Sequence, residues 1–318
     1  MSTPRMSDTR LTLVADVGGT NTRVALARGT ELMESALRRY RNAEFTCLEA
    51  VLRAHLDAAG AGTPHATCVA IAGPVAAGAA RMTNLDWHVT ETGIARATGA
   101  GSAALLNDLQ AQGHALPPAA PGAPPRLVIG VGTGFNAVAV HATAAGTMVT
   151  ASESGHVGLP ITTEAELAFA RHLGGGHIEA EDALSGPGLA RLDAWLAAET
   201  GGRDPKKGAP AGRDAAAVMA ALEAGEPRAR AACEHFARML GKLAGDLALV
   251  HLPFGGIWLS GGMARALWPW LDTLGFREGF HDKARFSELM ARFELRLVTD
   301  DYAALKGCAA YHGRLAPG

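Results

Sequence analysis

Two polar side chains at the end of a short apolar run could face a bound ligand. Residues 103–106, AALL, are typical of a buried strand, and Asn107 and Asp108 follow directly. Ligands of open α/β sheets bind at the carboxyl ends of strands, so Asp108 can face a bound substrate there. The same position suits a helix N-cap for residues 109–116, and the residues alone leave both roles open.

A glycine-interrupted loop carries a second set of candidates. Glu153 and His156 stand three residues apart, and Glu181 shortly precedes Ser185 and Pro187, which are typical of a helix start. One carboxylate and one imidazole on such a loop can both point toward a polyhydroxyl ligand. Surface glutamates and single histidines also occur without any ligand. Capping by Ser185 does not exclude a ligand role for Glu181.

Two glycine-rich turns could bind phosphate. The first lies between the strand-forming runs LTLVAD and RVALA, and its small residues let successive backbone N–H groups close on an anion. Asp16, at the end of the first run, could hold the Mg²⁺ that accompanies a nucleotide. Residues 128–141, VIGVGTGFNAVAVH, repeat the plan, and both stretches predict a β-hairpin. Ligand-free glycine turns are common and an Asp before glycines can be a turn former, but such a repeat indicates an internal duplication, with one phosphate-facing turn on each side of a cleft.

The other segments predict alternating helices and strands. Thr46 and Glu49 have capping-box spacing before a helix, and residues 228–251 form the longest helical pattern. Residues 257–260 predict a strand that runs through two glycines into a helix over 263–274, a junction where a flat ring or a phosphate can approach the backbone. Residues 201–213 predict an exposed, solvated loop. The proline-rich loop 117–125 favours a domain boundary near residues 110–125.

Composition narrows the class of protein. The chain has 318 residues, 48% of them hydrophobic and 19% charged, with a net charge of −2, which describes a globular protein and excludes a nucleic-acid surface. No apolar run is long enough for a membrane span, and the polar first nine residues predict no signal peptide. The four cysteines lack CxxC spacing and fit a reducing cytoplasm. A Walker-type phosphate loop and a GxGxxG dinucleotide fingerprint are both missing from the sequence.

Taken in order, these motifs resemble the bacterial ATP-dependent glucokinase family, within the sugar kinase, heat-shock protein 70 and actin superfamily. The matching stretches are DVGGTNTR, LLNDLQA, GVGTGFN, SESGHVGLP, LSGPGL and FGGIWLSGGMA. The resemblance runs from about Leu11 to the C-terminal helix. It implies an α/β fold of two actin-like (ribonuclease H-like) domains with a deep interdomain cleft. The small domain would contain residues 1–109 plus 301–318, and the large domain residues 110–300.

The resemblance also implies roles for individual residues. Asp108 falls on the catalytic base, and ATP with Mg²⁺ is the expected phosphoryl donor. Asp16 would hold the metal through water or through the nucleotide. The sugar ligands would be Asn107, Glu153, His156 and Glu181. The phosphate turns would be Asp16, Val17, Gly18, Gly19 and Thr20 in the first hairpin, and Gly132, Thr133 and Gly134 in the second, with Gly261 and Gly262 on the adenosine side.

Two departures bear on the substrate. Asn136 and Ser154 stand where common members of the family carry glycine, and the added Ser154 hydroxyl could change which hexose fits. The expected reaction is phosphorylation of glucose to glucose 6-phosphate by a cytoplasmic enzyme, with a homodimer as the default assembly. The alternatives are a kinase for another hexose or amino sugar, and a non-catalytic sugar-sensing protein with the same fold.

Overall fold

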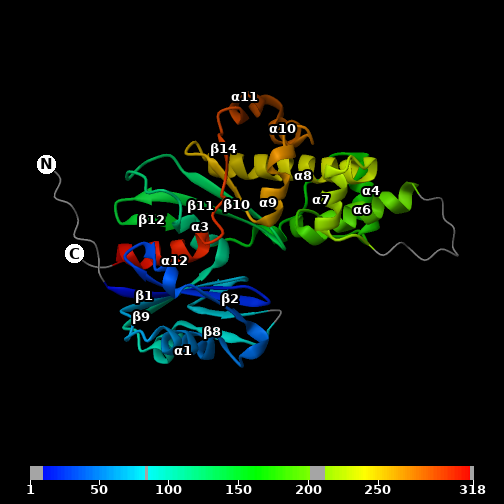
Figure 1. Cartoon of the computed structure of the whole chain (residues 1–318). Helices are drawn as coiled ribbons and strands as arrows, with labels where there is room; N and C mark the ends of the chain where they lie inside the picture. The colour runs from blue at the N-terminus through cyan, green and yellow to red at the C-terminus, as the bar shows by residue number, and fades with distance from the viewer. Residues whose placement is uncertain (1–9, 83–84, 201–211, 316–318) are drawn as a thin grey trace. The chain divides into compact units, whose positions relative to one another are not determined.

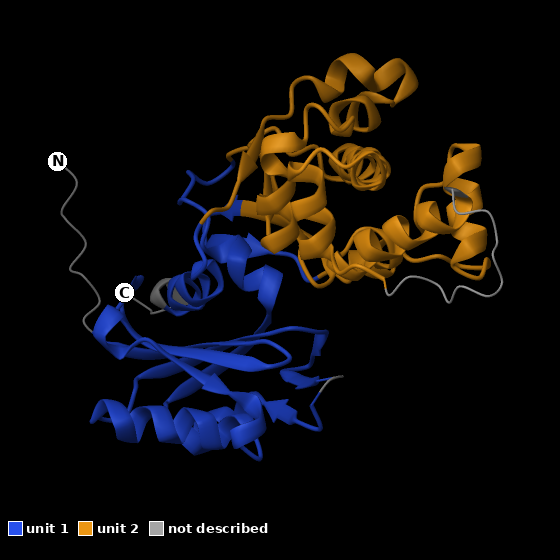
Figure 2. Cartoon of the chain, turned by 45° about the vertical axis from the view of Figure 1, so that its right-hand side comes forward, with its two compact units in different colours: residues 1–122, 142–151, 300–318 blue, residues 123–141, 152–299 orange. Residues whose placement is uncertain are grey.

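The computed structural model describes residues 10–82, 85–200 and 212–315, and it divides the chain into two compact units. Unit 1 contains residues 1–122, 142–151 and 300–318, and unit 2 contains residues 123–141 and 152–299 (Figure 2, blue and orange). The chain therefore enters unit 2 just after the proline-rich loop and returns to unit 1 for its last helix.

The first predicted hairpin is confirmed and lies within the main sheet of unit 1. Strand β1 (Leu11–Val17) pairs antiparallel with β2 (Asn21–Arg28) and parallel with β5 (Ala66–Ile71), which pairs parallel with β9 (Ser102–Asn107). Every residue of β5 is buried, as expected for a strand covered on both faces. The shorter strands are β3 (Glu31–Leu32) and β4 (Arg38–Arg41), which pair with β2, and a separate sheet of β6 (Val75–Ala76), β7 (Ala79–Arg81) and β8 (His88–Thr90).

Two apolar layers cover this sheet because successive strand residues point to opposite faces. Leu13 and Val17 of β1 pack in one cluster with residues of α1 (Leu48–Ala59) and α2 (Glu91–Thr98). Val14 belongs to the opposite cluster, with residues of α3 (Asp108–His114) and α12 (Ala303–Leu315). Figure 1 shows α1 and α12 on the two sides of the sheet. Asp108, the first residue of α3, therefore lies directly at the carboxyl end of β9.

Unit 2 repeats the strand plan around the second predicted hairpin, which is also confirmed. Strand β10 (Arg126–Val131) pairs antiparallel with β11 (Phe135–Thr143) and parallel with β13 (Ile257–Ser260), and β13 pairs parallel with β14 (Leu295–Leu297). The order β12-β11-β10-β13-β14, with β12 at Gly146–Val149, matches β3-β2-β1-β5-β9 in the first sheet. A hairpin followed by two parallel strands thus occurs twice, as the duplicated glycine turns indicate.

The core of unit 2 is built on α8 (Pro227–His251), whose buried residues include Phe236, Met239, Leu240 and Leu243. Its apolar positions follow helical spacing, so one stripe faces the sheet and the neighbouring helices. The other helices are α4 (Glu164–His172), α5 (Ala180–Ala183), α6 (Gly186–Thr200), α7 (Ala215–Glu223), α9 (Gly262–Leu267), α10 (Phe276–His281) and α11 (Ser287–Met290).

Two local predictions were wrong. The N-cap of α1 is Cys47 rather than Thr46, and no side chain caps it. The helix after β13 ends at Leu267, where the chain enters the 3-10 turn Trp268–Trp270 with Pro269 as its second residue. Residues 201–211 of the predicted exposed loop lie outside the described part; of its last two residues, Gly212 is exposed and Arg213 forms ion pairs with Asp193 and Glu226. Within the described residues, every helix is too short or too polar to cross a membrane.

Candidate active site

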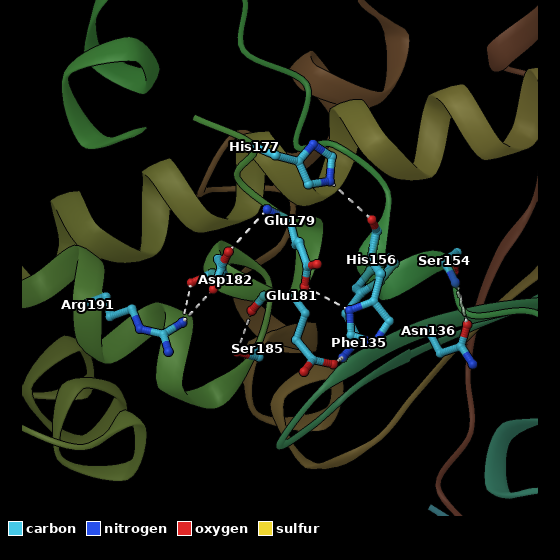
Figure 3. A network of polar contacts seen from close by, with 10 residues as sticks. All are labelled: Phe135, Asn136, Ser154, His156, His177, Glu179, Glu181, Asp182, Ser185 and Arg191. Carbon is cyan, nitrogen blue, oxygen red and sulfur yellow. Dashed lines mark hydrogen bonds and ion pairs between the residues drawn. The ribbon is translucent and has the colours of Figure 1, made fainter. Parts of the chain in front are cut away.

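The structure brings three predicted sugar ligands together in unit 2. Glu153 directly precedes the 3-10 turn Ser154–His156, His156 is the last residue of this turn, and Glu181 lies on the short helix α5. Glu153 is close enough to His156 and Glu181 for both charges to affect its pKa. The Glu181 carboxylate accepts a hydrogen bond of 2.8 Å from the backbone N–H of Phe135, the first residue of β11 (Figure 3). This carboxylate therefore lies beside the Gly132–Gly134 turn.

The same glycine turn is held from its other side by the start of α6. The backbone N–H of Gly186 donates to the carbonyl oxygen of Gly132 at 2.7 Å, and the Ser185 hydroxyl accepts from the N–H of Gly188 at 3.1 Å. Ser185 thus caps α6 as predicted, while Glu181 remains on its own helix. A Cβ atom added at Gly132 would meet nothing within 4 Å, whereas one at Gly134 would overlap the Glu181 carboxylate, so the open space beside the turn is at Gly132.

Burial and neighbouring charges set the ionisation of this cluster. Burial raises the pKa of Glu153; His156 lowers that pKa and Glu181 raises it further. The pKa of His156 is raised, chiefly by a 2.7 Å hydrogen bond between its Nδ1 and Oε2 of Glu179. Glu179 was not among the predicted residues. It stands two positions before Glu181, but no local pattern marks it, because its contact with His156 depends on how two separate segments pair.

The departures at Asn136 and Ser154 interact directly. Asn136 Oδ1 accepts from the backbone N–H of Ser154 at 3.0 Å and lies 3.1 Å from its hydroxyl, while Nδ2 donates to the carbonyl oxygen of Ser152 at 2.7 Å. Ser154 is buried. Its hydroxyl is therefore used inside the protein, in a brace between the second hairpin and the loop that carries Glu153.

The two glycines predicted to lie on the adenosine side, Gly261 and Gly262, directly follow the neighbouring strand β13 in unit 2. Because β10 and β13 are parallel and in register from Leu127 with Ile257, Gly261 at the end of β13 lies beside Val131. A Cβ atom at Gly261 would overlap the Val131 backbone, and its φ of 100° also favours glycine. Gly262 is open to its surroundings. The structure thus brings Gly261 and Gly262 next to the Gly132–Gly134 turn.

In unit 1 the question of which residue caps α3 is answered by Asn107. Its Oδ1 accepts from the N–H groups of Leu109 and Gln110 at 3.0 and 3.4 Å, and its Nδ2 donates to the Gly73 carbonyl oxygen at 3.1 Å. Asp108 is the first helical residue, and its Oδ1 accepts from the Leu109 N–H at 2.7 Å. The helix therefore begins with a cap that does not require the Asp108 carboxylate.

The first glycine turn closes on itself beside Asp16. The Gly18 N–H donates to the Asn21 carbonyl oxygen at 3.0 Å, and Asn42 Nδ2 donates to the Gly18 carbonyl oxygen at 2.7 Å. Burial raises the pKa of Asp16, and Arg23, opposite it on β2 and 3.7 Å away, lowers it. In the described part of the chain, no group of three His, Cys, Asp or Glu side chains could hold a metal ion. Asp16 is thus a single carboxylate that could at most share a metal with a nucleotide.

Comparison with known proteins gives the family. The glucokinase family model matches residues 13–314. The glucokinase of Caulobacter vibrioides (strain NA1000 / CB15N) is 33% identical over 319 residues, 94% of each chain, and that of Chromobacterium violaceum is 34% identical over 314 residues, 94% of this chain and 88% of its own. A crystal structure of glucokinase from an Antarctic psychrotroph matches with a TM-score of 0.79 and 29% identity, over 95% of this chain and 98% of that one. The chain therefore belongs to the glucokinase family.

Proposed function

We propose that this protein phosphorylates glucose at the expense of ATP and forms glucose 6-phosphate. The observation that carries the proposal is the convergence of Glu153, His156 and Glu181 beside a glycine turn, in a chain that matches glucokinases over almost its whole length. Asp108 acts as the base that accepts the proton of the sugar hydroxyl. A hydroxyl is a poor nucleophile, and kinases use a carboxylate in this role while the phosphoryl group is transferred.

The donor set suits a polyhydroxyl substrate. Each carboxylate offers two oxygen atoms to sugar hydroxyls, so Glu153 and Glu181 can each accept two hydrogen bonds. Asn107 uses its Oδ1 and one Nδ2 hydrogen within the protein, so it can give the sugar its second Nδ2 hydrogen. A sugar that leaves one of these groups unpaired in the closed site loses affinity, which favours one hexose over its isomers.

The glycine turns suit the nucleotide. The space beside Gly132 and Gly262 is open, since an added Cβ atom would meet nothing within 4 Å at either position, and this leaves room for phosphate and adenosine groups. The first turn, from Asp16 to Thr20, is the counterpart on unit 1. Asp16 is the residue that would hold Mg²⁺, through water or through the nucleotide, and the ion would neutralise charge on the phosphates.

The remaining expectations belong to the same proposal. The chain has the fold of the sugar kinase, heat-shock protein 70 and actin superfamily, with domains of residues 1–109 plus 301–318 and 110–300 that close a cleft around the substrates and exclude water. It works in the cytoplasm, in agreement with the four cysteines of the described chain being free. It assembles as a homodimer, which sedimentation analysis of the purified protein would test.

The decisive experiment measures the release of ADP in a coupled assay with glucose, ATP and Mg²⁺. It compares the wild type with Asp108→Asn. The variant should bind glucose normally in calorimetry and lose turnover by several orders of magnitude, because the amide cannot accept the proton. Asp86→Asn, at an exposed carboxylate of unit 1, is the matched control and should behave as the wild type. Turnover retained by Asp108→Asn would remove it from the role. A panel of hexoses and amino sugars identifies a preferred substrate other than glucose.

A further inference from the structure

Glu179 and His156 are joined by backbone pairing as well as by their side chains. Gly158 and Glu179 form an antiparallel bridge, and the Ala180 N–H donates to the Val157 carbonyl oxygen at 2.8 Å. The Glu179 N–H donates to Asp182 Oδ2 at 3.1 Å at the start of α5. Figure 3 shows the Glu179 side chain directed at the imidazole. The contact is thus built into the fold, although both side chains are partly exposed.

This contact determines which ring nitrogen is available. A carboxylate accepts hydrogen bonds, so Nδ1 of His156 carries the proton that is donated to Glu179 Oε2. Across residues 10–82, 85–200 and 212–315, no protein group binds Nε2, and His177 contacts only the backbone carbonyl of His156, at 3.4 Å. Nε2 is therefore the ring atom that can meet a ligand.

The charges around the imidazole favour its protonated form. Glu179 faces it from the segment before α5, Glu181 from α5 itself, and Glu153 from its own loop, and all three raise the pKa of His156 while burial lowers it. His177 Nε2 lies 3.4 Å from the backbone carbonyl oxygen of His156. A protonated His156 presents an N–H donor at Nε2, whereas Glu153 and Glu181 present acceptors. The cluster then offers a hydroxyl-bearing ring both kinds of hydrogen-bond partner.

We propose that Glu179 is a positioning residue for the hexose: it orients His156 and keeps it charged, so that Nε2–H donates to a sugar hydroxyl oxygen. The inference deepens the proposed function of this site and rests on it. Charge-assisted hydrogen bonds are about twice as strong as neutral ones. Above the pH at which the imidazole loses its charge, Nε2 becomes an acceptor and this interaction is replaced by a weaker one.

The test is Glu179→Gln, which keeps the size of the side chain and an acceptor oxygen but removes the charge. The NMR titration of His156, assigned with His156→Gln, should move to lower pH. The KM for glucose should rise by about tenfold at a pH between the His156 titration midpoints of the two proteins, with kcat within about twofold, and should rise little well below both midpoints, where the imidazole is charged in both. The decisive quantity is how the ratio of the two KM values, variant over wild type, changes with pH. A merely structural role of Glu179 would give a ratio that does not depend on pH.

Asp182→Asn is the matched control, since Asp182 lies on α5 just after Glu179 and contacts the Glu179 backbone and Arg191. It should leave the His156 titration unchanged and give a KM ratio that does not vary with pH. The double variant His156→Gln/Glu179→Gln should match His156→Gln alone. If the wild type releases ADP with glucose but Glu179→Gln leaves both the titration and the KM profile unchanged, the role of Glu179 is refuted and the proposed function stands. If calorimetry shows no glucose binding by the wild type, both fail.

Discussion

Gly155 lies so close to the carbonyl oxygen of Phe135 that a Cβ atom at this position would overlap it. The same atom would lie 3.3 Å from Oε2 of Glu181, the carboxylate that Phe135 binds through its N–H. Gly155 stands between Glu153 and His156 in the chain. The loop that carries Glu153 and His156 can therefore approach the second hairpin this closely only because Gly155 has no side chain.

Gly155→Ala should reduce the affinity for glucose by tenfold or more, because the loop must move away from Phe135 and Glu181, and displaced binding groups lose alignment steeply. Overpacking of this kind should also lower the free energy of unfolding by about 1–3 kcal/mol. Calorimetry with glucose and urea unfolding measure the two effects. Gly62→Ala is the matched control, since a Cβ atom there meets nothing within 4 Å. Unchanged glucose affinity in Gly155→Ala would show that the loop does not need this close approach.

Ser154→Gly should leave the choice of hexose unchanged. The Ser154 hydroxyl lies 3.1 Å from Asn136 Oδ1 and is buried, so it is not available to a sugar. Its removal should lower the stability by about 1 kcal/mol, the typical contribution of one hydrogen bond. Asn136→Gly should cost more, since Asn136 also binds Ser152 and the Ser154 backbone. Ratios of kcat/KM for glucose, mannose and glucosamine decide the matter, and a changed ratio in Ser154→Gly would contradict this assignment.

Features encoded by neighbouring residues could be predicted from the sequence, and features made by distant pairing could not. Both hairpins were predicted because their turns and strand-forming runs are contiguous. The place of Asp108 at a strand end followed from the short apolar run before it. Glu179 was missed because its bond to His156 depends on the pairing of residues 157–159 with 178–180.

The helix start at residue 48 shows the limit of a local motif. Capping-box spacing made Thr46 the expected cap, yet Cys47 is the N-cap and α1 starts one residue later. The buried face, with Leu48, Val51 and Leu52, is the same for either start, so the apolar pattern cannot distinguish them. The Glu49 carboxylate lies beside Gly93 on α2.

His55 should make unit 1 sensitive to acid. It is fully buried on α1, and burial together with the charge of Arg38 lowers its pKa from 6.5 to about 4. The unfolded chain takes up a proton on His55 near pH 6.5, whereas the folded chain takes it up only near pH 4. The free energy of unfolding therefore falls as the pH drops from about 6.5 to 4, and His55 causes no further loss below pH 4. The difference corresponds to about 3 kcal/mol.

Urea unfolding of the wild type and of His55→Gln at pH 7.5 and pH 4.5 measures this effect. The variant should lose less stability between the two pH values than the wild type does. His88→Gln, at an exposed histidine of β8, is the control and should follow the wild type at both pH values. Equal pH dependence in all three proteins would mean that His55 takes up its proton equally easily in the folded chain.

A buried ion pair between α4 and α8 should make Lys242 one of the most sensitive positions of unit 2. Lys242 Nζ contacts Oε1 of Glu166 and the Thr162 hydroxyl, and the two charged residues are 7% and 5% exposed. Burial alone would raise the pKa of Glu166, but hydrogen bonds from Lys242 and from the backbone of Thr162 and Thr163 hold it below its usual value. The carboxylate is therefore charged in the folded protein, and removing its partner leaves a buried charge uncompensated.

Lys242→Met should lower the free energy of unfolding by about 3–5 kcal/mol, the typical effect of breaking a buried pair from one side. Lys242→Met/Glu166→Gln should recover most of this loss, because the glutamine carries no charge. Its side-chain oxygen can still accept hydrogen bonds from the N–H groups of Thr162 and Thr163 at the start of α4. Glu234→Gln, in the half-exposed pair with Arg230 on the same helix, should change stability by only about 0.5 kcal/mol. Chemical denaturation of the four proteins at pH 7 gives these values. A double variant as unstable as Lys242→Met would show that lost packing of the lysine stem, rather than the isolated Glu166 charge, causes the destabilisation.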